Sequence, residues 1–123
     1  MQEDTLYKLY KNCNLCPRAC HVDRLSGQLG FCSCNAPKAN VNLTMLHFGE
    51  EPVISGVRGS GAVFFEGCQL RCVFCQNYQI SRAPTFTGKA MTAQELSSEY
   101  LRLEASGAHN INLVTPLHYA PTI

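Results

Sequence analysis

The chain has 123 residues and a mass of 13.6 kDa, which is the size of one ordinary domain. Hydrophobic residues make up 46% and charged residues 15%, a composition typical of chains that bury a core and unlike disordered segments. The formal net charge is +1 and the basic residues are scattered, so no nucleic-acid partner is expected. The longest purely apolar run, 62–65, is far too short to cross a bilayer, so no membrane partner is expected either.

The first 40 residues mix cysteines, glycines and prolines without a sustained period, which predicts an irregular segment with a short helix over 5–11. Weak alternation around Val41, Leu43 and Met45 then predicts a short strand or ribbon, followed by a glycine-containing loop that reaches residue 61. An irregular segment of this length needs a cross-link, such as a bound metal ion, in order to fold.

Residues 62–115 predict a βαβ unit. The run 62–65 is rich in β-branched and aromatic residues and predicts a buried strand. From Thr92 apolar residues recur at helical spacing, Thr92-x-x-Glu95 matches a capping box, and Gly107 suits the C-terminal stop. Residues 111–115 predict a second strand. The order strand, helix, strand implies that the two strands are parallel.

The N-terminus carries acidic residues and no basic segment followed by an apolar core, so it does not resemble a secretory signal. We therefore expect a cytoplasmic protein. In that reducing compartment clustered cysteines hold metals or perform redox chemistry more often than they form disulfides. The eight cysteines fall into an N-terminal group and a second group; these are Cys13, Cys16, Cys20, Cys32 and Cys34, and Cys68, Cys72 and Cys75.

In the N-terminal group, Cys13, Cys16, Cys20 and Cys32 are candidate ligands of a structural zinc ion, because four thiolates would supply folding energy to an irregular segment. A second iron–sulfur cluster accepts the same four ligands, and free thiols are the third alternative. Cys34 is surplus to either metal site, and we expect it to be buried.

The second group has the spacing C-x3-C-x2-C and directly follows the predicted strand. Iron–sulfur clusters normally take four cysteines, so three without a fourth nearby would leave one iron of a four-iron cluster open to a substrate or cofactor. Two alternatives stay open: a zinc site that a remote histidine such as His47 completes, and a set of buried thiols.

Residues 67–77, Gly-Cys-Gln-Leu-Arg-Cys-Val-Phe-Cys-Gln-Asn, closely resemble the signature of the radical S-adenosylmethionine (SAM) superfamily. The match includes the aromatic residue before the third cysteine, Phe74. More narrowly, 47–52 (His-Phe-Gly-Glu-Glu-Pro), 110–116 (Asn-Ile-Asn-Leu-Val-Thr-Pro) and 16–20 (Cys-Pro-Arg-x-Cys) are similar to the pyruvate formate-lyase activating enzyme-like group. The resemblance extends over about all of the chain.

The resemblance implies an oxidoreductase in which Cys68, Cys72 and Cys75 bind a 4Fe-4S cluster, SAM chelates the open iron, and Phe74 lies near the adenine. Reductive cleavage of SAM would then yield a 5′-deoxyadenosyl radical, chemistry that the cofactors carry while the protein positions them. It also implies an electron donor such as flavodoxin or ferredoxin, and the group's name points to a protein substrate. No protein acid or base is needed to form the radical, so no catalytic residue is nominated. A non-catalytic zinc or iron–sulfur module for structure or electron transfer is the alternative.

For the fold, the resemblance implies an α/β protein: the N-terminal part of a radical SAM partial (βα) barrel behind a cysteine-rich, irregular N-terminal cap. We expect the cap at 1–60 and the start of a truncated radical SAM core at 61–123. The chain supplies little more than one βα unit of that barrel, so we expect it not to turn over SAM alone. Residues 115–118, Thr-Pro-Leu-His, stand where superfamily members often have Gly-Gly-Glu, so the SAM amino group would be held differently.

Overall fold

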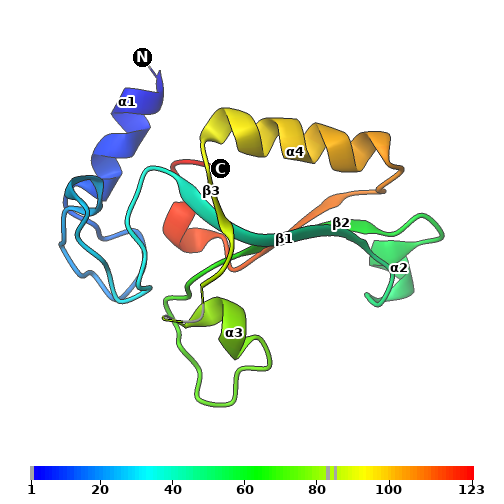
Figure 1. Cartoon of the computed structure of the whole chain (residues 1–123), viewed down its shortest axis with the longest axis horizontal. Coiled ribbons are helices and arrows are strands. Elements are labelled where there is room, and N and C mark those ends of the chain that lie inside the picture. Colours follow the sequence, from blue (N-terminus) through cyan, green and yellow to red (C-terminus); the bar gives the residue numbers. More distant parts are fainter. Residues whose placement is uncertain (1, 83, 85) are drawn as a thin grey trace.

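The computed structural model describes residues 2–82, 84 and 86–123 (Figure 1). These residues form a four-stranded sheet with the order β3-β1-β2-β4. Its strands are β1 (Ala39–His47), β2 (Ser60–Phe65), β3 (Lys89–Met91) and β4 (Ile111–Val114). The helices are α1 (Gln2–Tyr7), α2 (Pro52–Ser55), α3 (Tyr78–Ser81) and α4 (Ala93–Ala105), with 3-10 turns η1 (Lys8–Tyr10), η2 (Arg24–Ser26) and η3 (Leu117–Tyr119). Figure 1 shows α4 along one face of the sheet and α3 projecting on the other side.

The sheet is mixed. Strands β2 and β4 pair in parallel, with Val63 opposite Leu113. Helix α4 lies between them in the chain, so the predicted βαβ unit is confirmed. Strand β1 runs antiparallel to both β2 and β3. The short edge strand β3 lies between the second cysteine group and α4, in a stretch for which the sequence predicted no element.

The expectation of a radical SAM partial barrel is wrong. Repeated βα units place parallel strands beside one another, whereas β1 and β3 are antiparallel to their neighbours. Within the described residues the chain is a small mixed sheet with few helices, and no barrel is evident. Alternation around Val41 correctly indicated a strand, but the period of a strand carries no information about which strand it pairs with or in which direction. Strand β1 lies within 1–60 and pairs with β2, which begins at Ser60, the last residue of the expected cap.

Helix α4 begins at the predicted capping box. The Thr92 hydroxyl accepts the Glu95 N–H at 3.2 Å, and the Glu95 carboxylate accepts the Thr92 N–H at 3.5 Å. Gly107, with φ of 104°, follows the helix end as predicted. In the part of the chain that the structure describes, neither this helix nor any other is long and apolar enough to cross a bilayer.

The core lies between α4 and the sheet and extends into the N-terminal segment. Leu96 and Leu103 of α4 are buried against β2 and its neighbours. The core cluster joins residues from the N-terminal segment, β1, β2, α4 and η3; its members are Cys32, Cys34, Ala39, Val41, Val63, Phe65, Leu96, Leu103 and Tyr119. Two cysteines of the N-terminal group therefore belong to the same core as the sheet.

We expect Leu103→Ala to lower the free energy of unfolding by about 2–5 kcal/mol, because it removes a side chain with 0% exposure and leaves a cavity under the sheet. Leu101→Ala on the same helix is the matched control, since Leu101 is 62% exposed and should change stability by less than about 0.5 kcal/mol. Urea denaturation followed by circular dichroism measures both. An equal loss of unfolding free energy in the two variants would contradict the burial of Leu103 against the sheet.

Candidate functional site

The second cysteine group lies on a closed loop at the carboxyl end of β2. We call residues 67–80 the cysteine loop. A hydrogen bond from the Gly67 N–H to the Ile80 carbonyl, at 2.9 Å, closes its base, and α3 forms its last turn. Figure 1 shows the loop and α3 projecting away from the sheet on the side opposite α4. The closure confines all three cysteines of the group to one short excursion of the backbone.

Gly67 marks the place where the N-terminal segment packs against the start of this loop. Its φ is +83°, and a Cβ at this position would lie 2.4 Å from the Cys34 sulfur and 2.5 Å from the Cys32 carbonyl oxygen. Real Cβ atoms do not approach other atoms so closely, and a positive φ already favours glycine. The N-terminal cysteines and the cysteine loop therefore meet in a contact that tolerates no side chain at Gly67.

The three thiols differ in exposure. Cys68 is buried, and its sulfur accepts the Leu70 N–H at 3.4 Å. Cys72 and Cys75 are half-buried, and the Ser81 hydroxyl donates to the Cys75 sulfur at 3.6 Å. Among the described residues, no three His, Cys, Asp or Glu side chains lie close enough together to hold a metal ion. The structure thus places the predicted ligands on one loop without bringing their sulfurs together.

Arginines from two segments hold the loop backbone. Arg18 donates to the Gln69 carbonyl at 2.9 Å and to the Leu70 carbonyl at 3.3 Å. Arg82 donates to the Cys72 carbonyl. The loop contains Arg71, Arg82 follows it closely, and 67–82 contain no acidic residue, so this segment is positively charged. Sequence reasoning treated the basic residues as scattered and missed these roles, because only the fold brings Arg18 to the loop.

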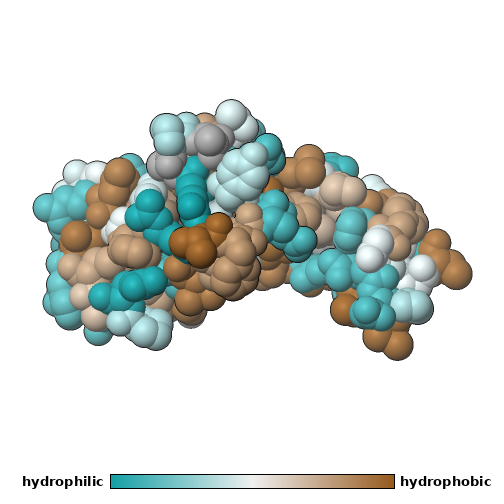
Figure 2. Space-filling model, turned by 90° about the horizontal axis from the view of Figure 1, so that it is seen from below, coloured by the Kyte–Doolittle hydropathy of each residue, from teal (hydrophilic) through white to brown (hydrophobic). Residues whose placement is uncertain are grey.

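Several apolar side chains of the loop face solvent. Phe74, which we expected near an adenine ring, is 86% exposed, and Val73 is 90% exposed. Leu70 is also exposed. Figure 2, which looks at the molecule from the side toward which the loop projects, shows apolar surface interleaved with strongly polar surface. The position of Phe74 relative to a nucleoside stays a prediction.

His47, the histidine proposed for a zinc site, does not reach the cysteine loop. It pairs with Ser60 at the first residue of β2, whereas the loop follows the last residue of that strand. At about 3.3 Å per residue, the length of β2 separates the two places by roughly 17 Å. The His47 ring instead lies 3.8 Å from the Glu50 carboxylate, which also accepts from the Asn112 amide at 3.4 Å.

His118, at the end of the second predicted strand, is a buried structural group. It is 2% exposed, and its Nε2–H donates to the Glu66 carbonyl at 2.8 Å. Burial lowers the pKa of His118 to about 4, so the ring is neutral near pH 7. The ring holds the residue before the cysteine loop against the C-terminal turn η3.

The N-terminal cysteines are free thiols in the structure. Cys34 is 1% exposed, which confirms the expectation that it is buried. A hydrogen bond from the Cys34 thiol, helped by the charge of Arg24, lowers the pKa of Cys32 to about 6, and the same contact raises the pKa of Cys34. Cys13 and Cys32 are also buried, whereas Cys16 and Cys20 are half-buried.

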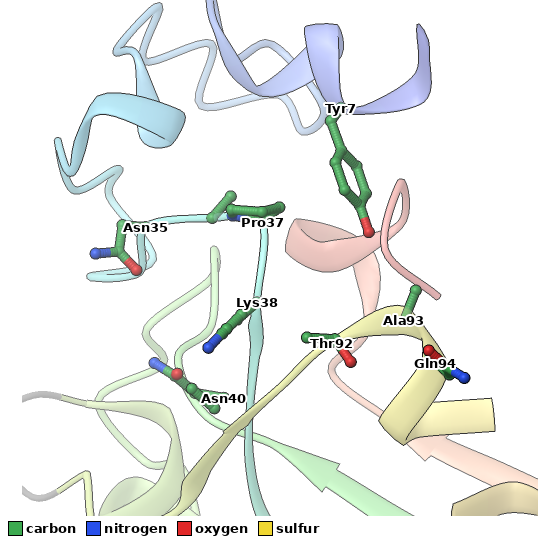
Figure 3. A pocket seen from close by; sticks show the side chains of 10 residues that line it. Tyr7, Asn35, Pro37, Lys38, Asn40, Thr92, Ala93 and Gln94 are labelled. Carbon is green, nitrogen blue, oxygen red and sulfur yellow. The ribbon is translucent and has the colours of Figure 1, made fainter. Parts of the chain in front are cut away.

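A pocket of about 520 Å³ lies elsewhere, between α1, the start of β1 and the start of α4 (Figure 3). Figure 3 shows Tyr7 entering from α1 and Lys38 lying beside Asn40. The lining residues are Tyr7, Asn35, Ala36, Pro37, Lys38, Asn40, Ala90, Thr92, Ala93 and Gln94, and none is a cysteine. This pocket therefore adds no metal ligand to the predicted site.

Comparison with known proteins finds one relative of undetermined function. The chain is 39% identical over 74 residues to the uncharacterized protein MJ0674 of Methanocaldococcus jannaschii. The match covers 60% of this chain and 20% of the relative, so the chain spans about a fifth of the relative's length. No protein-family model matches the chain. No solved structure matches it, so no structural neighbour supports the expected barrel.

We expect Gly67→Ala to destabilise the protein more than Gly27→Ala does. Both glycines have a positive φ, so each substitution should cost about 1–2 kcal/mol in backbone strain. Only at Gly67 would the new methyl group collide with Cys34 and Cys32, which should add about 1–3 kcal/mol. Urea denaturation of the two variants measures the difference. Equal losses would contradict the close contact between the N-terminal cysteines and the cysteine loop.

Acidification should destabilise the protein through His118. Its pKa is about 4 in the folded chain and has an ordinary value of 6.5, so below about pH 6.5 the unfolded state binds the extra proton. The contribution is fully present above this value and is lost as pH falls toward 4, by about 2 kcal/mol between pH 7 and pH 5. Urea titrations at several pH values measure it. His118→Gln keeps a donor for the Glu66 carbonyl and should remove this part of the pH dependence; an unchanged dependence would contradict the assignment.

Proposed function

We propose that the cysteine loop is the ligand set of a 4Fe-4S cluster that binds SAM, in an oxidoreductase of the activating-enzyme type. The observation that carries the proposal is the set of three thiols on one closed loop, Cys68, Cys72 and Cys75. Cys34 reaches the base of this loop, but its thiol lies 3.3 Å from the Glu66 carbonyl and 3.5 Å from the Cys32 carbonyl. Three loop thiols, with the Cys34 thiol at the base of the loop engaged by carbonyls, are consistent with a cluster that keeps one iron open.

The donor set fits the proposed group chemically. Cysteine thiolates are the usual ligands of iron–sulfur clusters, and these three lie within eight consecutive residues of one loop. A cluster with thiolate ligands and the SAM carboxylate both bring negative charge. Arg18, Arg71 and Arg82 supply positive charge there, and no acidic residue opposes it within 67–82. The chemistry supplied by such a group is one-electron reductive cleavage of the SAM sulfonium.

The chain's own residues position the loop and do not act as acids or bases. Arg18 and Arg82 hold its backbone carbonyls, and the hydrogen bond between Gly67 and Ile80 holds its base. The exposed apolar side chains of Phe74 and Val73 offer surface for the adenosyl part of SAM. The electron donor, of the flavodoxin or ferredoxin kind, and a protein substrate belong to the same proposal and rest on the resemblance alone.

Anaerobic reconstitution with iron and sulfide, followed by EPR of the reduced chain with and without SAM, tests this function. We expect a cluster signal that changes when SAM is added. The signal should disappear in the triple variant C68S/C72S/C75S. Cys34→Ser is the matched control and should keep both the cluster and its response to SAM, because Cys34 is not a ligand in this proposal.

Three results would contradict the proposal. A cluster that survives in the triple variant would lie elsewhere in the chain. A cluster that depends on the loop cysteines but ignores SAM would favour the alternative of a non-catalytic electron-transfer module. Zinc bound at the loop in place of iron would favour a structural module.

A further inference from the structure

The N-terminal segment contains a buried positive charge. Arg24, in the turn η2, is 0% exposed. Its guanidinium donates to the Cys34 carbonyl at 3.0 Å, the His118 carbonyl at 2.6 Å and the Asn35 carbonyl at 3.4 Å. The rings of Tyr10 and Tyr119 lie 4.8 and 5.4 Å from its central carbon. These contacts satisfy hydrogen-bond donors, but none of them carries a full negative charge.

No carboxylate balances this charge in the described part of the chain, where each of the ion pairs involves other residues. The neighbouring Asp23 side chain is occupied in capping η2, where it accepts the Leu25 and Ser26 N–H groups. The buried Glu66 carboxylate accepts from Asn42 and two backbone amides. Arginine does not lose its proton in proteins, and an unpaired buried charge costs several kcal/mol. A negative group near Arg24 is therefore required.

The groups that surround Arg24 are thiols. The Cys13 sulfur lies 3.8 Å from its Nη1. A Cβ atom placed on Gly30 would lie 3.5 Å from the Cys32 sulfur, 3.8 Å from the Cys20 sulfur and 3.9 Å from the Arg24 Cδ. The Cys13 sulfur thus lies beside the guanidinium, and the Cys32 and Cys20 sulfurs lie near the same stretch of Gly30 that the Arg24 stem approaches. Cys16 follows Cys13 by three residues.

The backbone around these cysteines resembles that of a metal site. The Phe31 N–H points to the Cys20 sulfur at 3.2 Å, a contact that orients a thiolate and stabilises its charge. Ala19 and His21, on either side of Cys20, and Ser33, after Cys32, all have positive φ without being glycine. Such strain persists only where the surroundings enforce it.

We propose that Cys13, Cys16, Cys20 and Cys32 bind one zinc ion in a closed tetrathiolate site, and that Arg24 balances its negative charge. Spacings of two and three residues between the first ligands are typical of structural zinc. Cys34 is excluded as a ligand because its thiol lies 3.3 Å from the Glu66 carbonyl and 3.5 Å from the Cys32 carbonyl, whereas the Cys32 sulfur has one longer contact, 3.9 Å, with the Cys34 carbonyl. The sulfurs are gathered but not at ligand distances, so zinc draws them together and stabilises a segment that has no strand between residues 11 and 38. This site does not depend on the function of the cysteine loop.

The test uses the full chain with C68S/C72S/C75S, so that metal bound by the loop is not counted. We expect about one zinc per folded chain by mass spectrometry of the metal content. The zinc should be lost on further Cys20→Ser and kept on further Cys34→Ser. Cobalt substituted for zinc should show the visible absorption of a tetrahedral tetrathiolate site. Iron with sulfide in place of zinc, no metal in a folded sample, or zinc that survives Cys20→Ser would each overturn the site.

The role of Arg24 is tested by chelator competition in the same background. We expect Arg24→Met to weaken zinc binding about 10–100-fold, the usual effect of removing a group that supports metal ligands. Arg24→Lys keeps the charge and should recover most of the affinity, which a purely steric role would not predict. Arg58→Met, at an exposed arginine that contacts His109, is the control and should leave affinity unchanged. Equal affinities for the Arg24→Met and Arg58→Met variants would overturn the charge-balancing role, as would a loss in Arg24→Lys equal to that in Arg24→Met.

Discussion

The structure depends on a close contact of three chain segments at Glu66 and Gly67, where β2 ends and the cysteine loop begins. The Glu66 carbonyl lies 2.8 Å from His118 Nε2 and 3.3 Å from the Cys34 sulfur. The Glu66 carboxylate binds the backbone amides of Thr87 and Gly88, which lead into β3. The N-terminal segment, the C-terminal turn and the edge of the sheet are thereby held to one dipeptide. These contacts fix the position of Gly67, the first residue of the cysteine loop.

The same junction connects the two cysteine groups. Cys34 follows Cys32 by two residues and packs directly on Gly67, and Cys68 comes next in the chain. Arg24 reinforces the connection, since its guanidinium binds both the Cys34 and the His118 carbonyls. Because these contacts are direct, a movement of the N-terminal thiols would shift the backbone at the base of the loop. This connection is a property of the packing.

Electrostatics distinguishes the two groups. At the cysteine loop Arg18 and Arg71 are exposed and Arg82 is half-buried, so water screens much of their charge. At the N-terminal group the guanidinium of Arg24 is fully buried, so its charge needs a partner within the protein. The exposed cysteine loop, with three thiols, agrees with the cofactor-binding site that we propose there. A buried guanidinium with two buried and two half-buried thiols in the same segment agrees with the closed zinc site that we propose.

The sequence by itself determined the elements whose signals are local. The capping box at Thr92, the helix behind it, the strand at 62–65 and the pairing of β2 with β4 all follow from period, caps and chain order. The spacing of the cysteines also identified both candidate sites. Only the tertiary structure decided that β1 and β3 run antiparallel to their neighbours, that Arg24 is buried among thiols, and that His47 lies far from the cysteine loop. Each of these depends on contacts between residues distant in sequence, and hydrophobic period and residue spacing carry no information about such contacts.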